Sequence, residues 1–160
     1  MEIQTYVTVL MDTLEKKQNI LNKLYDATKC QEEVLDNQEV DVEAFEELMN
    51  RKELLLDKLQ ELDRGFDGIY QQISVSLQAQ KEMFKAQILK MQELIRELTS
   101  LGIKIQALEQ RNRDKFERYL TGERQEIRKF QTNHRTANLY HQHMANQHQQ
   151  WQSYFLDKKK

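Results

Sequence analysis

Residues 3–35 read IQTYVTVLMDTLEKKQNILNKLYDATKCQEEVL, and this stretch decides the fold. Its apolar residues recur at alternating steps of four and three, which is the heptad seam of a helix that packs along other helices. The seam positions are Val7, Leu10, Leu14, Lys17, Leu21, Leu24, Thr28, Gln31 and Leu35. The seam fades at Lys17, Thr28 and Gln31. The spacing predicts one helix of about 34 residues, roughly 50 Å long, and therefore an elongated molecule.

A turn is predicted at residues 36–41, where the heptad pattern stops. Asn37 can adopt the left-handed conformation after a helix end. Asp41 is expected to cap the next helix, because its carboxylate can accept hydrogen bonds from free backbone amides. Val40 and Phe45 stand at the positions of a hydrophobic staple. The short turn predicts that the first two helices lie antiparallel.

The second helix is predicted from a seam that continues through Gly65 and Gly68. Its positions are Phe45, Leu48, Lys52, Leu55, Leu59, Leu62, Phe66, Ile69 and Ile73. Each glycine costs about 1 kcal/mol in a helix relative to alanine. The glycine pair is consistent with a bend, a close helix crossing or a tolerated weakness, and we favour a continuous but bent helix.

A third helix is expected from near Leu77. Its apolar stripe contains Phe84, Ile88, Met91, Ile95, Leu98, Leu101, Ile105 and Leu108. It ends at Thr121-Gly122 or continues to about residue 132. We therefore predict a bundle over residues 1–132, with helices at about 2–36, 41–76 and 78–132, followed by a C-terminal segment at 133–160.

Composition supports an all-α fold, an elongated antiparallel bundle of long helices. The 160 residues include no proline and only four glycines, so long helices can run without a break. Cys30 is the only cysteine, which excludes an internal disulfide and suits a reducing compartment. No apolar run reaches the length of a membrane span, and the N-terminus lacks the pattern of a secretory signal. We therefore expect a cytoplasmic protein.

The charge is divided unevenly along the chain. Residues 1–63 contain 7 Lys and Arg against 16 Asp and Glu, a balance of −9, whereas residues 64–160 contain 17 against 10, a balance of +7. Antiparallel helices of opposite charge would select each other in this way. The basic segment from Arg111 to Arg135 could instead contact nucleic acid, but it also carries four acidic residues, so we expect no nucleic-acid partner.

No pattern of a catalytic or metal site occurs. Glycine-rich phosphate loops and nucleophile elbows are absent. His134, His141 and His148 are seven residues apart, about 10 Å along a helix, which is too far for one ion. Glu three residues before a His, the pattern of di-iron bundles, is also missing. We expect no catalytic residues, no metal and no cofactor.

The C-terminal segment carries an aromatic stripe. Ala137, Tyr140, Met144, Trp151 and Phe155 fall on one face of a helix, with Gln and Asn on the rest. So narrow a face is poor at folding alone. The stripe either docks on the bundle as ordinary core or anchors a partner, and a loosely docked helix that a partner displaces satisfies both interpretations.

The chain resembles the FlgN family of flagellar export chaperones. The resemblance covers the acidic first helix, the turn before Asp41 and above all residues 52–70, KELLLDKLQELDRGFDGIY, with the Gly65-Phe66 and Ile69-Tyr70 pairs. The end of the chain, from Trp151 to Phe155 and then three lysines, is similar to clostridial relatives.

The resemblance implies a cytoplasmic chaperone that holds hook-filament junction proteins before type III export, with contact to the export apparatus also allowed. It implies that the C-terminal helical region binds the client. The residues carried over are Tyr140, Met144, Trp151, Tyr154 and Phe155. The expected function is thus a non-enzymatic chaperone. The alternative is a structural coiled-coil protein that self-associates through its first two seams, and a homo-oligomer is left open.

Overall fold

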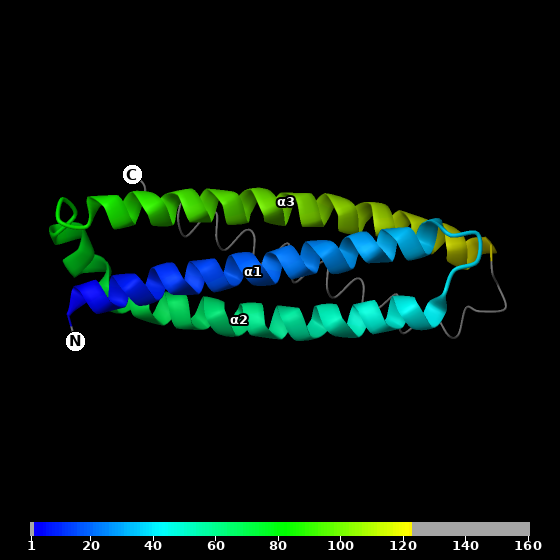
Figure 1. The fold of residues 1–160 in the computed structure, drawn as a ribbon, viewed down its shortest axis with the longest axis horizontal. Coiled ribbons are helices and arrows are strands. Elements are labelled where there is room, and N and C mark those ends of the chain that lie inside the picture. Colours follow the sequence, from blue (N-terminus) through cyan, green and yellow to red (C-terminus); the bar gives the residue numbers. More distant parts are fainter. Residues whose placement is uncertain (1, 123–160) are drawn as a thin grey trace.

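The computed structural model describes residues 2–122, which form three long helices (Figure 1). They are α1 (Ile3–Asp36), α2 (Val42–Ala79) and α3 (Lys85–Gly122). Within these residues there is no β-strand. The prediction of an elongated all-α bundle is confirmed.

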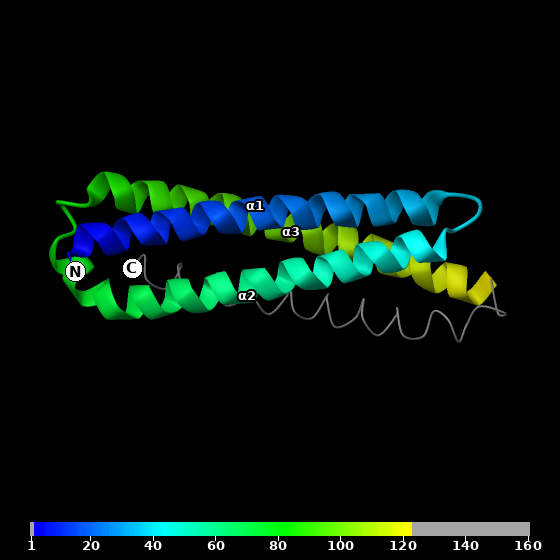
Figure 2. The same cartoon turned by 60° about the horizontal axis from the view of Figure 1, so that its bottom comes forward.

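Helix α1 lies between the other two. Its backbone packs closely on both α2 and α3, whereas the backbones of α2 and α3 do not approach each other (Figures 1 and 2). The chain runs along α1, returns along α2 and runs forward again along α3, so α1 and α3 are parallel. The hydrogen bonds from Gln18 to Glu97 and from Asn112 to Thr28 follow this parallel register.

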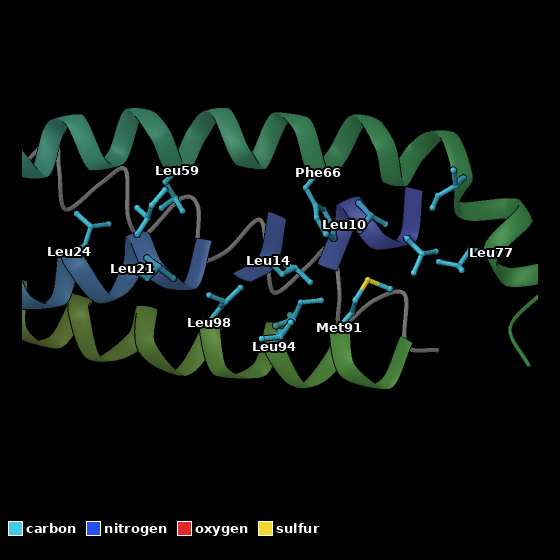
Figure 3. Close-up of a cluster of buried hydrophobic side chains, with 14 of the residues drawn as sticks. Leu10, Leu14, Leu21, Leu24, Leu59, Phe66, Leu77, Met91, Leu94 and Leu98 are labelled. Atoms are coloured by element: carbon cyan, nitrogen blue, oxygen red, sulfur yellow. The ribbon is translucent and has the colours of Figure 1, made fainter. Parts of the chain in front are cut away.

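The first seam supplies the centre of the core. Every predicted α1 seam position from Val7 to Gln31 is buried, including the polar ones, and Leu35 is half-buried. Figure 3 shows how leucines of α1 meet Leu59 and Phe66 from α2 and Leu94 and Leu98 from α3. Two neighbours pack on α1, so its buried face is wider than one seam and also includes Ile20 and Ala27.

Only one of the two rows of residues in the predicted α2 seam is buried. Phe45, Lys52, Leu59, Phe66 and Ile73 are buried as predicted. The other predicted row is only half-buried, and its members are Leu48, Leu55, Leu62 and Ile69. The neighbouring row is buried in its place at Met49, Leu56 and Leu77. A single heptad seam describes contact with one partner, whereas side chains of α2 meet both α1 and α3.

Gly65 and Gly68 do not break α2. The helix is continuous through both, and its axis curves without a sharp kink (Figure 2). Both glycines are exposed, and a Cβ added at either one would meet nothing within 4 Å. A close helix crossing at these residues is therefore excluded, and the glycines are a tolerated weakness of the helix.

The two connections differ in how well the sequence marks them. Asp41 caps α2 as predicted, because its Oδ1 accepts a hydrogen bond from the Ala44 amide at 3.1 Å. Helix α3 begins at Lys85, not near residue 78. Residues 80–84 form a turn in which the Met83 and Phe84 amides donate to the Gln80 carbonyl. No proline or glycine marks this turn, so the seam pattern continues across it.

Among α1, α2 and α3, no stretch combines the length and the apolarity that crossing a membrane requires.

Candidate functional site

The predicted partner-binding residues all lie outside the described part of the chain. They are Tyr140, Met144, Trp151, Tyr154 and Phe155. The structure therefore describes the frame from which residues 123–160 continue. That frame fixes where the segment starts: Gly122 lies at the end of the bundle where α1 ends and α2 begins (Figure 1).

This end of the bundle, which we call the exit end, has its own apolar cluster. The rings of Phe45 and Phe116 stack with centroids 5.0 Å apart and planes 3° from parallel. Both side chains are buried together with Met49. Partly buried residues surround them: Val34, Leu35, Val42, Tyr119 and Leu120. Because the stack joins α2 to α3, it holds the last turns of α3 on the bundle.

A buried polar layer lies about two turns inside the exit end. The Lys52 ammonium of α2 donates to Gln31 of α1 and forms an ion pair with Glu109 of α3. The Thr28 hydroxyl lies 3.1 Å from Glu109 Oε1, and Asn112 Nδ2 donates to the Thr28 carbonyl at 2.9 Å. The layer therefore joins all three helices through residues that are at most 5% exposed.

Several features of this buried polar layer lower the stability of the fold. Burial lowers the pKa of Lys52, against the opposing effect of Glu109. Among the described residues, Gln31 Nε2 and Asn112 Oδ1 find no hydrogen-bond partner, and each such buried atom costs about 1–3 kcal/mol. Polar groups in a seam fix the register and the choice of partner, because a shifted packing leaves the charges unpaired.

A second buried ion pair joins Lys17 of α1 to Asp63 of α2. Lys17 is 1% exposed, and its Nζ lies 5.9 Å from the centroid of the Phe66 ring. Burial lowers the pKa of Lys17 to about 8, even though Asp63 and Asp67 act to raise it. Keeping Lys17 charged in the folded protein at neutral pH therefore costs desolvation free energy.

Acidic α1 and basic α3 are paired near the exit end. Glu32 accepts from Arg111 at 3.3 Å and lies 3.5 Å from Lys115, which also pairs with Asp36 at 2.7 Å. The hydrogen bond to Asp36 is the main reason why the pKa of Lys115 is raised. Complementary charges thus do join helices, but the pair is parallel, not antiparallel as predicted. Arg111 and Lys115 are engaged within the fold, which weakens the nucleic-acid interpretation.

The exposed apolar side chains of the frame do not form a patch. Leu54 and Val75 of α2 are 66% and 81% exposed and lie on one outward row, but Glu61 and Gly68 stand between them. Leu89 and Ile103 of α3 share another row, with Arg96 between them. Single exposed apolar residues are ordinary on protein surfaces. The outward faces of the frame therefore offer no evident docking patch.

The described residues contain no arrangement suited to catalysis. In residues 2–122 no three His, Cys, Asp or Glu side chains are placed to hold a metal ion, and the four histidines lie beyond these residues. The perturbed lysines, Lys17 and Lys52, are enclosed and ion-paired. Cys30 is exposed.

Sequence reasoning missed Glu109 and Asn112 as members of the buried layer. The available signal was the set of polar residues at seam positions, Thr28, Gln31 and Lys52, because a buried polar side chain needs a polar partner. The periodicity of α3 did not identify that partner, since Glu109 follows Leu108 on the edge of the apolar stripe.

The described residues define a class of protein: a bundle of long helices whose apolar seams are used for packing within the chain. The family model described as FlgN protein matches residues 1–147. The chain belongs to the FlgN family, the family of flagellar export chaperones. No curated protein sequence and no solved structure matches the chain.

Proposed function

We propose that this chaperone binds hook-filament junction proteins in the cytoplasm and shields their amphipathic terminal helices until export. It acts by binding alone, without a catalytic step or a cofactor. Membership of the FlgN family, matched over residues 1–147, is the observation that carries the proposal. Shielding would prevent premature polymerisation, because the terminal helices of an unassembled subunit carry exposed apolar faces.

The aromatic stripe is the proposed client-binding site. Its large residues are Tyr140, Met144, Trp151 and Phe155, and the proposed site also includes Tyr154 next to Phe155. Two observations on the frame support this assignment: the seams of α1, α2 and α3 are buried within the bundle, and the exposed apolar residues are scattered. Four large anchors supply roughly 6–12 kcal/mol gross at about 1.5–3 kcal/mol each. Ordering the segment takes about 2–5 kcal/mol, which leaves a micromolar affinity within reach.

The alternative, a coiled-coil protein that self-associates through its first two seams, is less well supported. The α1 seam from Val7 to Gln31 is enclosed by α2 and α3 within one chain, so it is not available to a second copy. Sedimentation equilibrium separates the two proposals. A monomer that binds a client favours the chaperone, whereas a stable oligomer without client binding favours the alternative.

The direct test is titration calorimetry with purified hook-filament junction proteins from the same bacterium. The intact chain is compared with a Trp151→Ala, Phe155→Ala variant and with a control variant, Leu54→Ala, Val75→Ala, which removes exposed apolar groups from the frame. We expect binding by the intact chain and the control and a loss of at least tenfold in affinity for the aromatic variant. Full affinity in the aromatic variant would refute the site, and no binding by the intact chain would refute the client.

A further inference from the structure

One side of the bundle is left open by the packing of the described helices. Both α2 and α3 pack on α1, but their backbones do not approach each other. Side chains alone join α2 to α3, at the Phe45 and Phe116 stack and at the Lys52 and Glu109 pair. We call this side, between α2 and α3 and away from α1, the open side.

Hydrogen bonds identify the α2 residues on the open side. Gln72 donates to Tyr6 of α1 at 3.3 Å, so this face of α2 looks toward α1. Successive residues of an α-helix are rotated by about 100° around its axis. Viewed down the axis of α2, Gln72 is therefore rotated by about 120° from the buried Phe66 in one direction, and Asp67 by about 100° in the other. The row that contains Asp67, at steps of seven, is Glu46, Glu53, Gln60, Asp67 and Ser74. The α2 wall of the open side is therefore acidic and polar.

The α3 wall follows from the buried layer. Glu109 faces α2, and Asn112, about 60° away on the wheel, donates to the Thr28 carbonyl of α1. Gln106 lies about 60° to the opposite side of Glu109, away from α1. Its row, again at steps of seven, is Gln92, Thr99, Gln106 and Arg113, all half-buried. The side chains between the two walls are apolar: Met49 and Leu56 of α2 and Ile95 of α3 are buried, and Tyr70 of α2 and Ile88 of α3 are half-buried.

We propose that the open side is the docking site for residues 137–155 of this same chain, which lie along it as a fourth helix when no client is bound. The proposal rests on the proposed function, because the docked stripe is the client-binding site. Client and open side would then compete for the same aromatic residues. The docked form keeps an apolar stripe covered until a client of higher affinity displaces it.

The length of the chain fits this arrangement. Residues 123–160 number 38, the same as α2 and α3, so a segment that turns back after Gly122 can return along the whole bundle. Trp151 follows Gly122 by 29 residues, about 44 Å of helix. The level of Phe66 follows from the ring stack, which places Phe45 of α2 beside Phe116 of α3. The distance along α3 from Gly122 to Phe116, added to that along α2 from Phe45 to Phe66, is about 40 Å. Trp151 and Phe155 therefore reach the level of Phe66 and Tyr70.

Charge and polarity also match. Residues 123–160 contain 7 Lys and Arg against 3 Asp and Glu, a balance of +4, whereas residues 1–122 contain 17 against 23, a balance of −6. Arg128, Lys129 and Arg135 follow Gly122 closely in the sequence, so a docked segment would bring them to the level of Glu46 and Glu53. The Gln and Asn residues that flank the aromatic stripe suit the amide and hydroxyl groups of both walls.

Trp151 is the one tryptophan of the chain and gives a direct test, because an indole ring in contact with a bimane fluorophore quenches its emission. In a Cys30→Ser chain, bimane is attached to one cysteine introduced as Gln60→Cys, Asp67→Cys or Ser74→Cys. The matched control is bimane on the native Cys30, which is exposed on α1. Each labelled chain is compared with its Trp151→Phe counterpart. We expect Trp151 to reduce bimane emission at one or more of the three open-side positions and not at Cys30.

Charge reversal supplies a second comparison on one helix. Glu53→Lys places a positive charge on the open side, whereas Glu61→Lys places it on the outward row. We expect Glu53→Lys to weaken the quenching at Asp67→Cys and Glu61→Lys to leave it unchanged, with the difference reduced at high salt.

Two results of the quenching experiment would contradict the docking proposal. No quenching at any of the three positions would overturn the docking proposal. Quenching of a labelled Trp151→Phe chain on mixing with an unlabelled chain would overturn it in favour of a second copy as the occupant, because the labelled chain then has no tryptophan of its own. The assay contains no client, so self-docking can fail while the client-binding titration succeeds, and the reverse. If both hold, adding a purified hook-filament junction protein restores the bimane emission.

Discussion

Lys52 of α2 and Glu109 of α3 form an ion pair in the interior of the bundle, where their side chains are 0% and 6% exposed. The backbones of these two helices do not touch, so the pair spans the space between them. Gln31 and Thr28 bring α1 into the same layer. The ion pair and its two hydrogen-bonding neighbours therefore connect the three helices.

Removing one member of this pair is expected to be severe. Glu109→Leu removes the carboxylate that pairs with the enclosed Lys52 ammonium, and the free energy of unfolding should fall by about 3–5 kcal/mol. The double variant Lys52→Met, Glu109→Leu removes both charges and should regain most of that loss. Urea denaturation followed by circular dichroism at 222 nm measures both. Equal destabilisation by the single and double variants would contradict the assignment.

Lys17 should make stability depend on alkaline pH. Its pKa is about 8 in the folded protein, below the ordinary lysine value of 10.5, because burial disfavours the charged form. Between these values the unfolded chain binds the proton and the folded chain does not, so stability rises with pH, by about 3 kcal/mol in all. The difference in unfolding free energy between the natural chain and Lys17→Met, measured from pH 7.5 to 10.5, isolates this contribution. A flat difference would mean that Lys17 is not desolvated.

The exposed glycines of α2 offer a gain in stability. Gly65→Ala and Gly68→Ala should each raise the free energy of unfolding by about 0.4–1 kcal/mol, because both sites are helical and open to an added Cβ. Thermal and urea unfolding of the single and double variants check the effect. Destabilisation by either alanine would show that the helix needs glycine there for a reason outside the described contacts.

The cap of α2 can be tested with a close analogue. Asp41→Ala removes the acceptor for the Ala44 amide and should lower the free energy of unfolding by about 1 kcal/mol. Asp41→Asn keeps a side-chain oxygen at the same place and should retain most of the stability. If the two variants were equally destabilised, the charge of Asp41 and not its capping hydrogen bond would be responsible.

Much of the fold could be predicted from the sequence because heptad periodicity reports burial directly. The α1 seam was correct even at Lys17, Thr28 and Gln31. The second row of α2 and the start of α3 were not. Periodicity on one helix does not say how many neighbours it has, and the turn at residues 80–84 lacks proline and glycine.

The candidate site could be predicted less well. The polar seam residues signalled a buried layer, but their partner Glu109 could be identified only once α1 and α3 were known to be parallel. The client-binding assignment to Tyr140, Met144, Trp151, Tyr154 and Phe155 stays a prediction, since these residues lie beyond the described part of the chain.

The central position of α1 has a consequence for how the chain is synthesised. The ribosome releases α1 and α2 first, and these two helices already hold the complete Lys17 and Asp63 pair. The ion pair of Lys52 can form only after Glu109 has been translated, more than fifty residues later. The nascent hairpin can therefore form its own ion pair at once, whereas the buried layer at the exit end forms only when α3 is complete. Completion of α3 makes folding of the exit end cooperative, so the aromatic segment emerges from a frame that is already finished.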